Sequence, residues 1–278
     1  MLRSTLVLLC VALAVQAKPR KDPLTDLFGD KVKPFDLAEE PENKIVGGTE
    51  VRPPYSIPWQ VYIAPWGPKY ACGGTLISRR HVLTAAHCTE SWYPGGFREE
   101  FDVRVGEHRI SDGTAYDGTN YRVCNFVDHP NYVQTGMDYE FGTGYVIYDF
   151  SILFLNRAVK LGQRVIPANL PPPKFGGDYL VGKWLTVSGW GHWGSGGRMS
   201  DVLYSVKVPV IKQDQCKKMM VPKIVKNSNL CAGRNGIDAC QGDSGGTLSY
   251  STLSKYCFAS TKYVMALMFM SISIIIQI

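Results

Sequence analysis

The sequence lacks a long run of charge of either sign. Charged residues make up 19% of its 278 residues, and 30 basic against 24 acidic residues leave a net charge of +6. Proteins that bind nucleic acid usually concentrate basic charge in a stripe or a tail, so we expect no nucleic-acid partner. Disordered proteins are poorer in apolar residues than this chain, which is 45% hydrophobic. The composition therefore excludes a disordered protein and allows a sizeable core.

Sustained helical periodicity is also missing between residues 45 and 246. The 28 glycines and 17 prolines follow no fixed period, which excludes collagen and indicates many turns. The apolar runs are short and rich in β-branched and aromatic residues, as at 101–105 and 184–188. We therefore predict an all-β fold, an antiparallel barrel or sandwich, with one short helix near 212–220.

No apolar stretch reaches the length of about 20 residues that a helix needs to span a bilayer. The first stretch, Leu6 to Val15, has ten residues and lies between the basic Arg3 and the small residue Ala17. This pattern indicates a secretory signal peptide over 1–17, with a buried N-terminal strand or helix as the alternative. We therefore expect a secreted, extracellular protein, not bound to a membrane, whose cysteines form disulfides.

Residues 18–44 have a composition of their own. They contain no cysteine and carry six basic residues, seven acidic residues and four prolines, so they bury little apolar surface. The segment ends at Lys44, and a glycine-rich start follows at Ile45. We interpret 18–44 as a pro-segment that is cleaved after Lys44. The alternative, an interdomain linker, would require a folded domain before it.

Three motifs carry side chains suited to acyl transfer. His87 lies between small residues and Cys88, and Asp149 enters an apolar run, where an unpaired buried carboxylate would be costly. Ser244 is flanked by glycines that permit a tight turn with backbone N–H groups pointing inward. Each motif alone has an ordinary alternative: a structural histidine, a surface aspartate or a plain turn. Together they supply a base, an orienting acid and a nucleophile.

With these motifs the chain resembles the chymotrypsin-like serine proteases of the trypsin type. The resemblance implies two antiparallel six-stranded β-barrels with the active site in the cleft between them. It also implies a serine endopeptidase made as a zymogen. It spans a protease domain over residues 45–246, and the matching stretches follow the order of the family: Ile45–Gly48, Thr84–Cys88, Asp149 with its apolar neighbours, Ser188–Gly191 and Gly242–Gly246.

The resemblance implies a role for each matching residue. Ser244 attacks the scissile carbonyl, His87 transfers the proton and Asp149 orients the imidazole. The backbone N–H groups of Gly242 and Ser244 form the oxyanion hole. Asp238 lies at the floor of the specificity pocket, where a carboxylate selects Arg or Lys.

Activation and partners follow from the same resemblance. Cleavage after Lys44 frees the amine of Ile45, which then pairs with Asp243 and orders the oxyanion loop. The implied partners are an activating protease, protein or peptide substrates and protease inhibitors. Asp138 is a rival to Asp149 as the third member of the triad, but its neighbours match the family poorly.

The cysteines and two acidic residues are also compared with the pattern of the family. Removal of Cys10 with the signal peptide leaves seven of the eight cysteines, and Cys124 matches no common bridge. No zinc-like spacing occurs. Glu107 and Asp117 echo the family's calcium loop, but the shell is incomplete, so we expect no cofactor, with calcium as the alternative. The resemblance implies the bridges Cys72–Cys88, Cys216–Cys231 and Cys240–Cys257, with a free Cys240 as the alternative to the last.

The segment 247–278 departs from the family. It contains no Gly, Pro, Trp, Asp or Glu, and residues 263–278 are uncharged. The family's Ser-Trp-Gly strand, pocket-lining glycines and C-terminal helix are not visible there. We therefore expect an atypical tail after Gly246, produced by a frame shift, a retained intron or an alternative exon. We also expect an incomplete second barrel and slow turnover. The alternatives are an impaired or non-catalytic homologue that acts by binding, and a membrane-anchored form.

Overall fold

A computed structural model describes ten stretches of the chain. They are residues 48–64, 71–90, 102–110, 117–134, 146–170, 177–191, 199–219, 230–233, 243–250 and 267–268. The chain divides after Pro41, and every described residue belongs to the unit that begins at Glu42. Residues 1–47 lie outside the described residues, and so do Asp138, Asp238, Cys240, Gly242 and Cys257.

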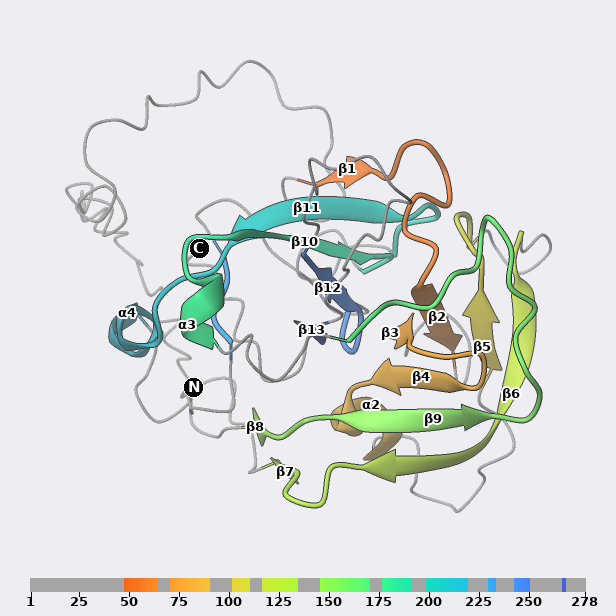
Figure 1. The fold of residues 1–278 in the computed structure, drawn as a ribbon, viewed down its shortest axis with the longest axis horizontal. Coiled ribbons are helices and arrows are strands. Elements are labelled where there is room, and N and C mark those ends of the chain that lie inside the picture. The colour runs from red at the N-terminus through yellow and green to blue at the C-terminus, as the bar shows by residue number, and fades with distance from the viewer. Residues whose placement is uncertain are drawn as a thin grey trace, which may run out of the picture. The chain divides into compact units, whose positions relative to one another are not determined.

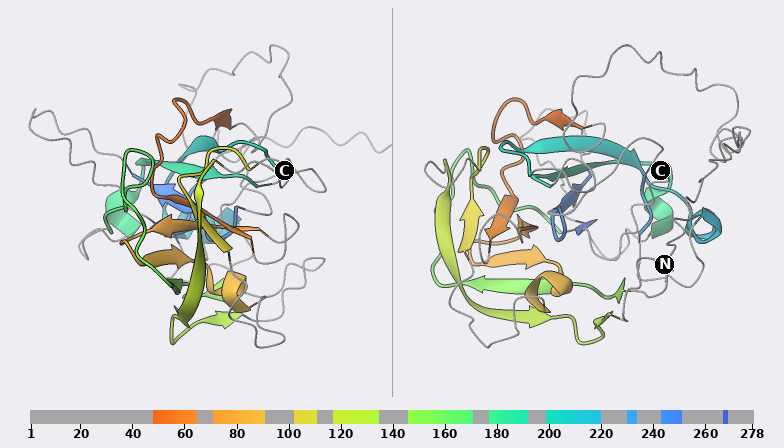
Figure 2. Two further views of the ribbon diagram at one scale, coloured as in Figure 1. Left: turned by 90° about the vertical axis from the view of Figure 1, so that its right-hand side faces the viewer. Right: turned by 180° about the vertical axis from the view of Figure 1, so that it is seen from behind.

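Six strands close into an antiparallel barrel, in the order β2-β3-β4-β9-β6-β5 (Figure 1). Inward positions carry aliphatic side chains, and Ile63, Leu76 and Leu153 are completely buried. Because the barrel is closed, it has no edge strand whose unpaired backbone groups could pair with another chain. Figure 2 shows the long, curved β6 along the side of this barrel. The strands are β2 Gln60–Ala64, β3 Cys72–Leu76, β4 His81–Thr84, β5 Asp102–Val105, β6 Thr119–Asp128 and β9 Ser151–Leu155.

The second group of strands is a five-stranded antiparallel sheet, in the order β1-β11-β10-β12-β13. Its core is aliphatic, and Leu185, Val187 and Leu248 are completely buried. The all-β fold is thus confirmed, with one closed barrel and, in the described part of the chain, an open sheet in place of a second barrel. The strands are β1 Thr49–Glu50, β10 Trp184–Gly189, β11 Tyr204–Pro209, β12 Thr247–Ser249 and β13 Leu267–Met268.

The sheet continues beyond Gly246, into the segment that the sequence analysis interprets as an atypical tail in place of the end of the domain. Strand β12 pairs with β10 on one side and with β13 on the other. All three residues of β12 are buried. Backbone pairing on both sides, together with the apolar side chain of Leu248 in the core, draws this segment into the sheet.

Three short helices and a small ribbon complete the described structure. Helix α4 is the helix predicted near 212–220, and it has Asp214 in its first turn and lysines in its last turn, as the helix dipole favours. None of the described helices is both long and apolar enough to cross a membrane. The elements are α2 Ala86–Glu90, α3 Gly177–Leu180, α4 Gln213–Met219, β7 Val133–Gln134 and β8 Val146–Ile147.

Contacts between the barrel and the sheet set the position of the loop before β12. The hydroxyl of Ser188 in β10 donates to the Oε1 atom of Gln60 in β2 at 2.7 Å. The hydroxyls of Thr75 in β3 and Thr247 in β12 are hydrogen-bonded at 2.9 Å. All four side chains are buried, so these bonds replace water at groups that would be costly to leave unpaired.

Candidate active site

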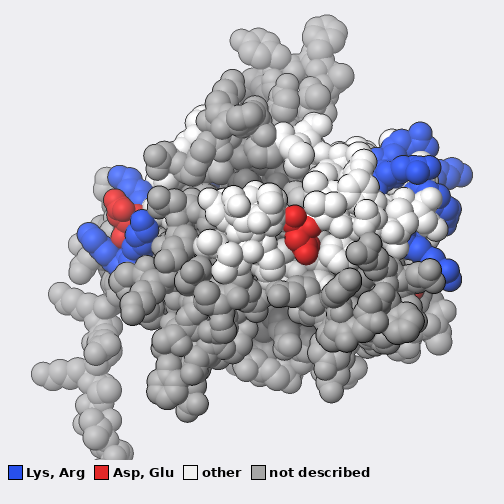
Figure 3. All heavy atoms as spheres, turned by 90° about the horizontal axis from the view of Figure 1, so that it is seen from below, with Lys and Arg blue, Asp and Glu red and all other residues white. Residues whose placement is uncertain are grey.

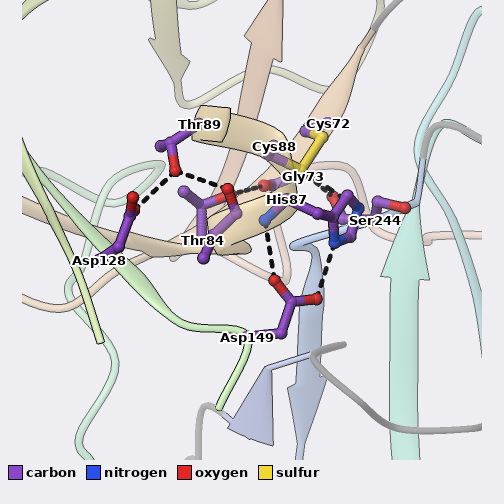
Figure 4. Close-up of a disulfide and its surroundings, with 10 residues drawn as sticks. Cys72, Gly73, Thr84, His87, Cys88, Thr89, Asp128, Asp149 and Ser244 are labelled. Carbon is purple, nitrogen blue, oxygen red and sulfur yellow. Dashed lines mark hydrogen bonds and ion pairs between the residues drawn. A yellow bond between two sulfur atoms is a disulfide. The ribbon is translucent and has the colours of Figure 1, made fainter. Parts of the chain in front are cut away.

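His87 lies on α2, immediately after β4. The two residues before it, Ala85 and Ala86, are completely buried, and their small side chains let the helix pack tightly against the barrel. A disulfide between Cys72 and Cys88 fastens α2 to β3, as the resemblance implies. Both sulfurs lie near His87, but a disulfide offers no thiolate to a metal ion. Figure 4 shows the bridge above the imidazole.

Asp149 precedes β9 and is 2% exposed. Its Oδ2 atom lies 2.7 Å from Nδ1 of His87, and its Oδ1 atom accepts the backbone N–H of His87 at 2.8 Å. One buried carboxylate therefore fixes both the main chain and the ring of a residue 62 positions away. With the Nδ1 proton directed at Asp149, the neutral ring keeps Nε2 as a proton acceptor. A surface aspartate at a strand edge, the alternative for Asp149, is excluded.

An unusual turn presents Asp149. Tyr148 adopts a φ of 51°, in the left-handed region that non-glycine residues rarely enter. The N–H of Phe150 donates to the carbonyl of Tyr148 at 2.7 Å, so the chain turns tightly around Asp149. The ring of His129 stacks on that of Tyr148, with centroids 4.8 Å apart and planes inclined by 8°. The sequence did not predict a role for Tyr148 and His129 at the site, because no local residue pattern indicates a tyrosine with a left-handed backbone.

The segment from Asp243 to Gly246 packs against β3. The carbonyl of Ser244 accepts the N–H of Gly73 at 2.7 Å, and Gly245 has a φ of 72°. A Cβ on Gly73 would lie 2.5 Å from the Cα of Gly246, so only glycine allows this approach. The Ser244 carbonyl and His87 Nε2 lie 3.7 and 3.8 Å from the same sulfur, that of Cys88. The structure thus brings Ser244 next to His87, as Figure 4 shows.

Asp243 is 1% exposed. Its Oδ1 atom accepts the N–H of Gly191 at 2.7 Å. A Cβ on either Gly189 or Gly191 would overlap the Asp243 carboxylate, so the glycines of this motif make room for the acid. Ile45, the partner that the resemblance implies for Asp243, lies outside the described residues.

Glu107 and Asp117 face each other beside β5. Burial, followed by the hydrogen bond and charge of Asp117, raises the pKa of Glu107 to about 8. Burial opposes ionisation of Asp117 too, but hydrogen bonds from Glu107, Tyr55 and two backbone N–H groups leave its pKa lowered. Both carboxylate oxygens of Asp117 accept hydrogen bonds, one from the hydroxyl of Tyr55 and the other from the backbone N–H groups of His108 and Arg109. The two acidic residues form a carboxyl–carboxylate pair, and residues 111–116 of the loop between them lie outside the described residues.

The remaining described cysteines form one further bridge. Cys216 of α4 is joined to Cys231, with Cα atoms 6.2 Å apart, which is the second pair that the resemblance implies. Cys124 is unpaired and exposed on β6, and its thiol donates to the carbonyl of Phe154 at 3.2 Å. The pairing of Cys240 with Cys257 falls on residues outside the described part of the chain.

Comparisons with known proteins agree with this geometry. The family described as Trypsin matches residues 45–261, which extends beyond Gly246. The chain is 35% identical over 211 residues to Ovochymase-2 of Mus musculus, covering 74% of this chain and 32% of that protein. It is 31% identical over 217 residues to the Clotting factor G beta subunit of Tachypleus tridentatus, covering 74% of this chain and 66% of that protein. It is 33% identical over 220 residues to Trypsin 5G1 of Aedes aegypti, covering 78% of this chain and 75% of that protein. The chain thus spans about a third of the first relative and about two thirds of the second.

Proposed function

Because the chain belongs to the trypsin family of serine proteases, we propose that it hydrolyses peptide bonds by acyl transfer, with Ser244, His87 and Asp149 as nucleophile, base and orienting acid. The observation that carries this proposal is the pair of hydrogen bonds from His87 to the buried Asp149 carboxylate. The position of Ser244 against the same disulfide as His87 supports it. We propose that hydrolysis needs no cofactor, because the three side chains supply the nucleophile, the base and the orienting acid.

The family's mechanism, together with the contacts of His87 and Asp149, supports a proposed role for each residue. The Ser244 hydroxyl attacks the scissile carbonyl while His87 Nε2 takes its proton, and the ring later returns that proton to the leaving amine. The positive charge that forms on His87 lies 2.7 Å from the buried Asp149 carboxylate. Backbone N–H groups of Gly242 and Ser244 stabilise the oxyanion, and one such donor is typically worth about 2.7–4 kcal/mol of barrier.

The proposal includes secretion and activation by cleavage. The signal-peptide pattern over 1–17 and the two disulfides support an extracellular compartment. An activating protease cuts after Lys44, and the new amine of Ile45 pairs with Asp243, which is already buried and held by Gly191. Because 18–44 contains no cysteine, the pro-segment separates completely. A fragment that stays attached on a non-reducing gel would contradict this step.

The expected substrates are proteins or peptides with Arg or Lys before the cleaved bond, and protease inhibitors are a further class of partner. Asp238 carries this specificity through a charge-assisted pair with the substrate cation. Replacing Asp238 with Ser should remove the preference for Arg and Lys while leaving the acylating groups in place. Cleavage by the unchanged chain mainly after Phe or Ala would show that Asp238 does not line the pocket.

The central experiment compares the activated chain with its Ser244→Ala variant on an Arg-ester substrate and with a fluorophosphonate that labels reactive serines. The unchanged chain should hydrolyse the ester and take up one label, and Ser244→Ala should do neither. Ser205→Ala removes a hydroxyl from β11 and serves as the matched control, with normal rates expected. If the unchanged chain shows neither hydrolysis nor labelling after cleavage at Lys44, the proposed function is wrong.

A further inference from the structure

The segment that follows β9 brings together basic residues from distant parts of the chain. The N–H groups of Leu155, Asn156 and Val159 donate to the carbonyls of Arg80, Arg122 and Arg79 at 2.9, 2.9 and 2.7 Å. The same segment carries two further cations. We refer to the five residues as the basic face: Arg79, Arg80, Arg122, Arg157 and Lys160.

The five charges of the basic face are not neutralised by the described protein. No ion pair joins any of the five to an acidic residue in the described stretches. Asp102 lies opposite Arg122 in the β5–β6 pair but forms no ion pair with it. All five members are exposed. Figure 3 shows Lys and Arg side chains gathered at the right of the molecule, the side on which Figure 1 places β5 and β6. Like charges gathered on one face repel one another, and a bound anion would relieve that repulsion.

Two of the five side chains are held by the protein itself. The guanidinium of Arg157 lies 4.3 Å from the ring centroid of Tyr121, and its Nη2 donates to the carbonyl of Asn120 at 3.0 Å. Nε of Arg79 donates to the carbonyl of Val159 at 3.3 Å. Each guanidinium has five N–H donors, so most of them remain for a ligand. Side chains that are ordered in advance lose less entropy when a ligand binds.

We propose that the basic face binds a sulfated polysaccharide. Four of its five cations are arginines, whose planar forks pair with oxyanions by two hydrogen bonds at once. The cations come from the bend before β4, from β6 and from the segment after β9, so they suit an extended polyanion better than a single ion. Tyr121, the aromatic ring beneath Arg157, is 3% exposed and cannot stack on a nucleic-acid base. The two disulfides belong to an oxidising compartment, where a heparin-like chain is the expected polyanion.

The basic face lies at the far end of the strands that carry the active site. Thr84 pairs with Ser151 at one end of β4 and β9, next to His87 and Asp149, and His81 pairs with Phe154 at the other end, next to Arg80. Three residue steps along a strand separate these ends by about 10 Å. Bound polysaccharide would therefore hold the protease at a matrix without occupying the proposed catalytic groups.

The test measures binding of the full, disulfide-bonded chain to heparin as a function of NaCl concentration. The Ser244→Ala background prevents self-digestion, so the result does not depend on the proposed hydrolysis. The triple variant Arg80→Gln/Arg122→Gln/Lys160→Gln should bind at least about tenfold more weakly at 0.15 M salt, and its slope of log K against log salt should fall by about two to three. The matched control, Lys207→Gln/Lys212→Gln/Lys218→Gln, removes three exposed charges outside the face and should bind like the parent chain.

Further probes identify the ligand chemistry. Hyaluronan and desulfated heparin, which keep carboxylates but lack sulfate, should bind weakly, and a DNA duplex should bind more weakly than heparin at the same salt. Near-UV circular dichroism checks that each variant is folded, and Arg80→Lys/Arg122→Lys should restore much of the affinity. No binding to heparin, an equal loss in the control variant, or equal binding of desulfated heparin or DNA would overturn the proposal.

Discussion

At the scale of single residues, the contact between His87 and Asp149 decides what the site can do. The carboxylate is buried and accepts two hydrogen bonds from one partner, so it selects both the position and the tautomer of the ring. An amide in its place would present a donor to Nδ1 and favour the tautomer that has no lone pair at Nε2. In the proposed mechanism, Asp149 therefore acts through His87 rather than on the substrate.

We expect Asp149→Asn to lower kcat by about 10⁴-fold on an Arg-ester, with a much smaller change in KM, since the wrong tautomer predominates. Steady-state kinetics of the activated protein measure this. Asp128→Asn is the control, because Asp128 also contacts α2, accepting the Thr89 hydroxyl at 2.7 Å, but does not reach the ring. Equal losses in the two variants would show that Asp149 only supports the helix.

Glu107 makes the stability of the protein depend on pH. Its pKa rises from the ordinary 4.5 to about 8, so the folded state keeps a proton that the unfolded chain has released within this window. The free energy of unfolding should therefore fall as pH rises from about 5 to about 8. In Glu107→Gln this fall should be smaller, because the amide is neutral and can still donate to Asp117. Urea unfolding at pH 5 and pH 8 without calcium measures it. The exposed Asp201→Asn is the control, and an unchanged slope in Glu107→Gln would contradict the assignment.

At the scale of elements, the turn between β8 and β9 holds Asp149 in place. The left-handed Tyr148 is unfavourable by itself, and its stack on His129 offsets part of that cost. His129 is fixed in turn, because its N–H donates to the carbonyl of Phe150 at 2.8 Å and its Nδ1 accepts the N–H of Asn131 at 3.1 Å. The end of β6 and the start of β9 thus support the proposed triad together.

Replacing Tyr148 with Asn should lower kcat by up to about 10²-fold while KM changes little, because Asn tolerates the left-handed backbone but leaves His129 without a stacking partner. Tyr148→Phe keeps the ring and should retain most of the activity. Rates and circular dichroism of both variants provide the comparison. If Phe and Asn reduce kcat equally, the stack has no positioning role.

At the scale of the whole molecule, residues beyond Gly246 are part of the fold. Strand β12 lies between β10 and β13, and Leu248 is completely buried in the core of the sheet. The slow turnover expected from the atypical tail stays a prediction. It is checked by comparing the activated chain with a version that carries a relative's segment after Gly246.

Leu248→Ala should destabilise the protein by about 2–5 kcal/mol, because a buried leucine is lost and a cavity remains. Urea unfolding measures the change, with the half-exposed Leu161→Ala as a control that should cost little. An unaffected free energy of unfolding in Leu248→Ala would mean that the segment after Gly246 does not belong to the folded domain.

The sequence by itself determined the all-β class, the helix near 212–220 and the three motifs that contain His87, Asp149 and Ser244. These features are local: short β-branched runs favour strands, and glycines around a serine permit a tight turn. The first closed barrel agrees with the family resemblance. The domain boundaries stay a prediction, and composition alone does not show that β12, within the segment interpreted as an atypical tail, pairs on both sides.

Only the tertiary structure decided which distant residues meet. It placed Asp149 against His87, stacked His129 on Tyr148 and gathered Arg80, Arg122 and their neighbours into the basic face. It also set the pKa of Glu107, because burial and a facing carboxylate arise only when separate strands and loops pack together. Such contacts depend on barrel closure and strand register, which no local pattern of residues specifies.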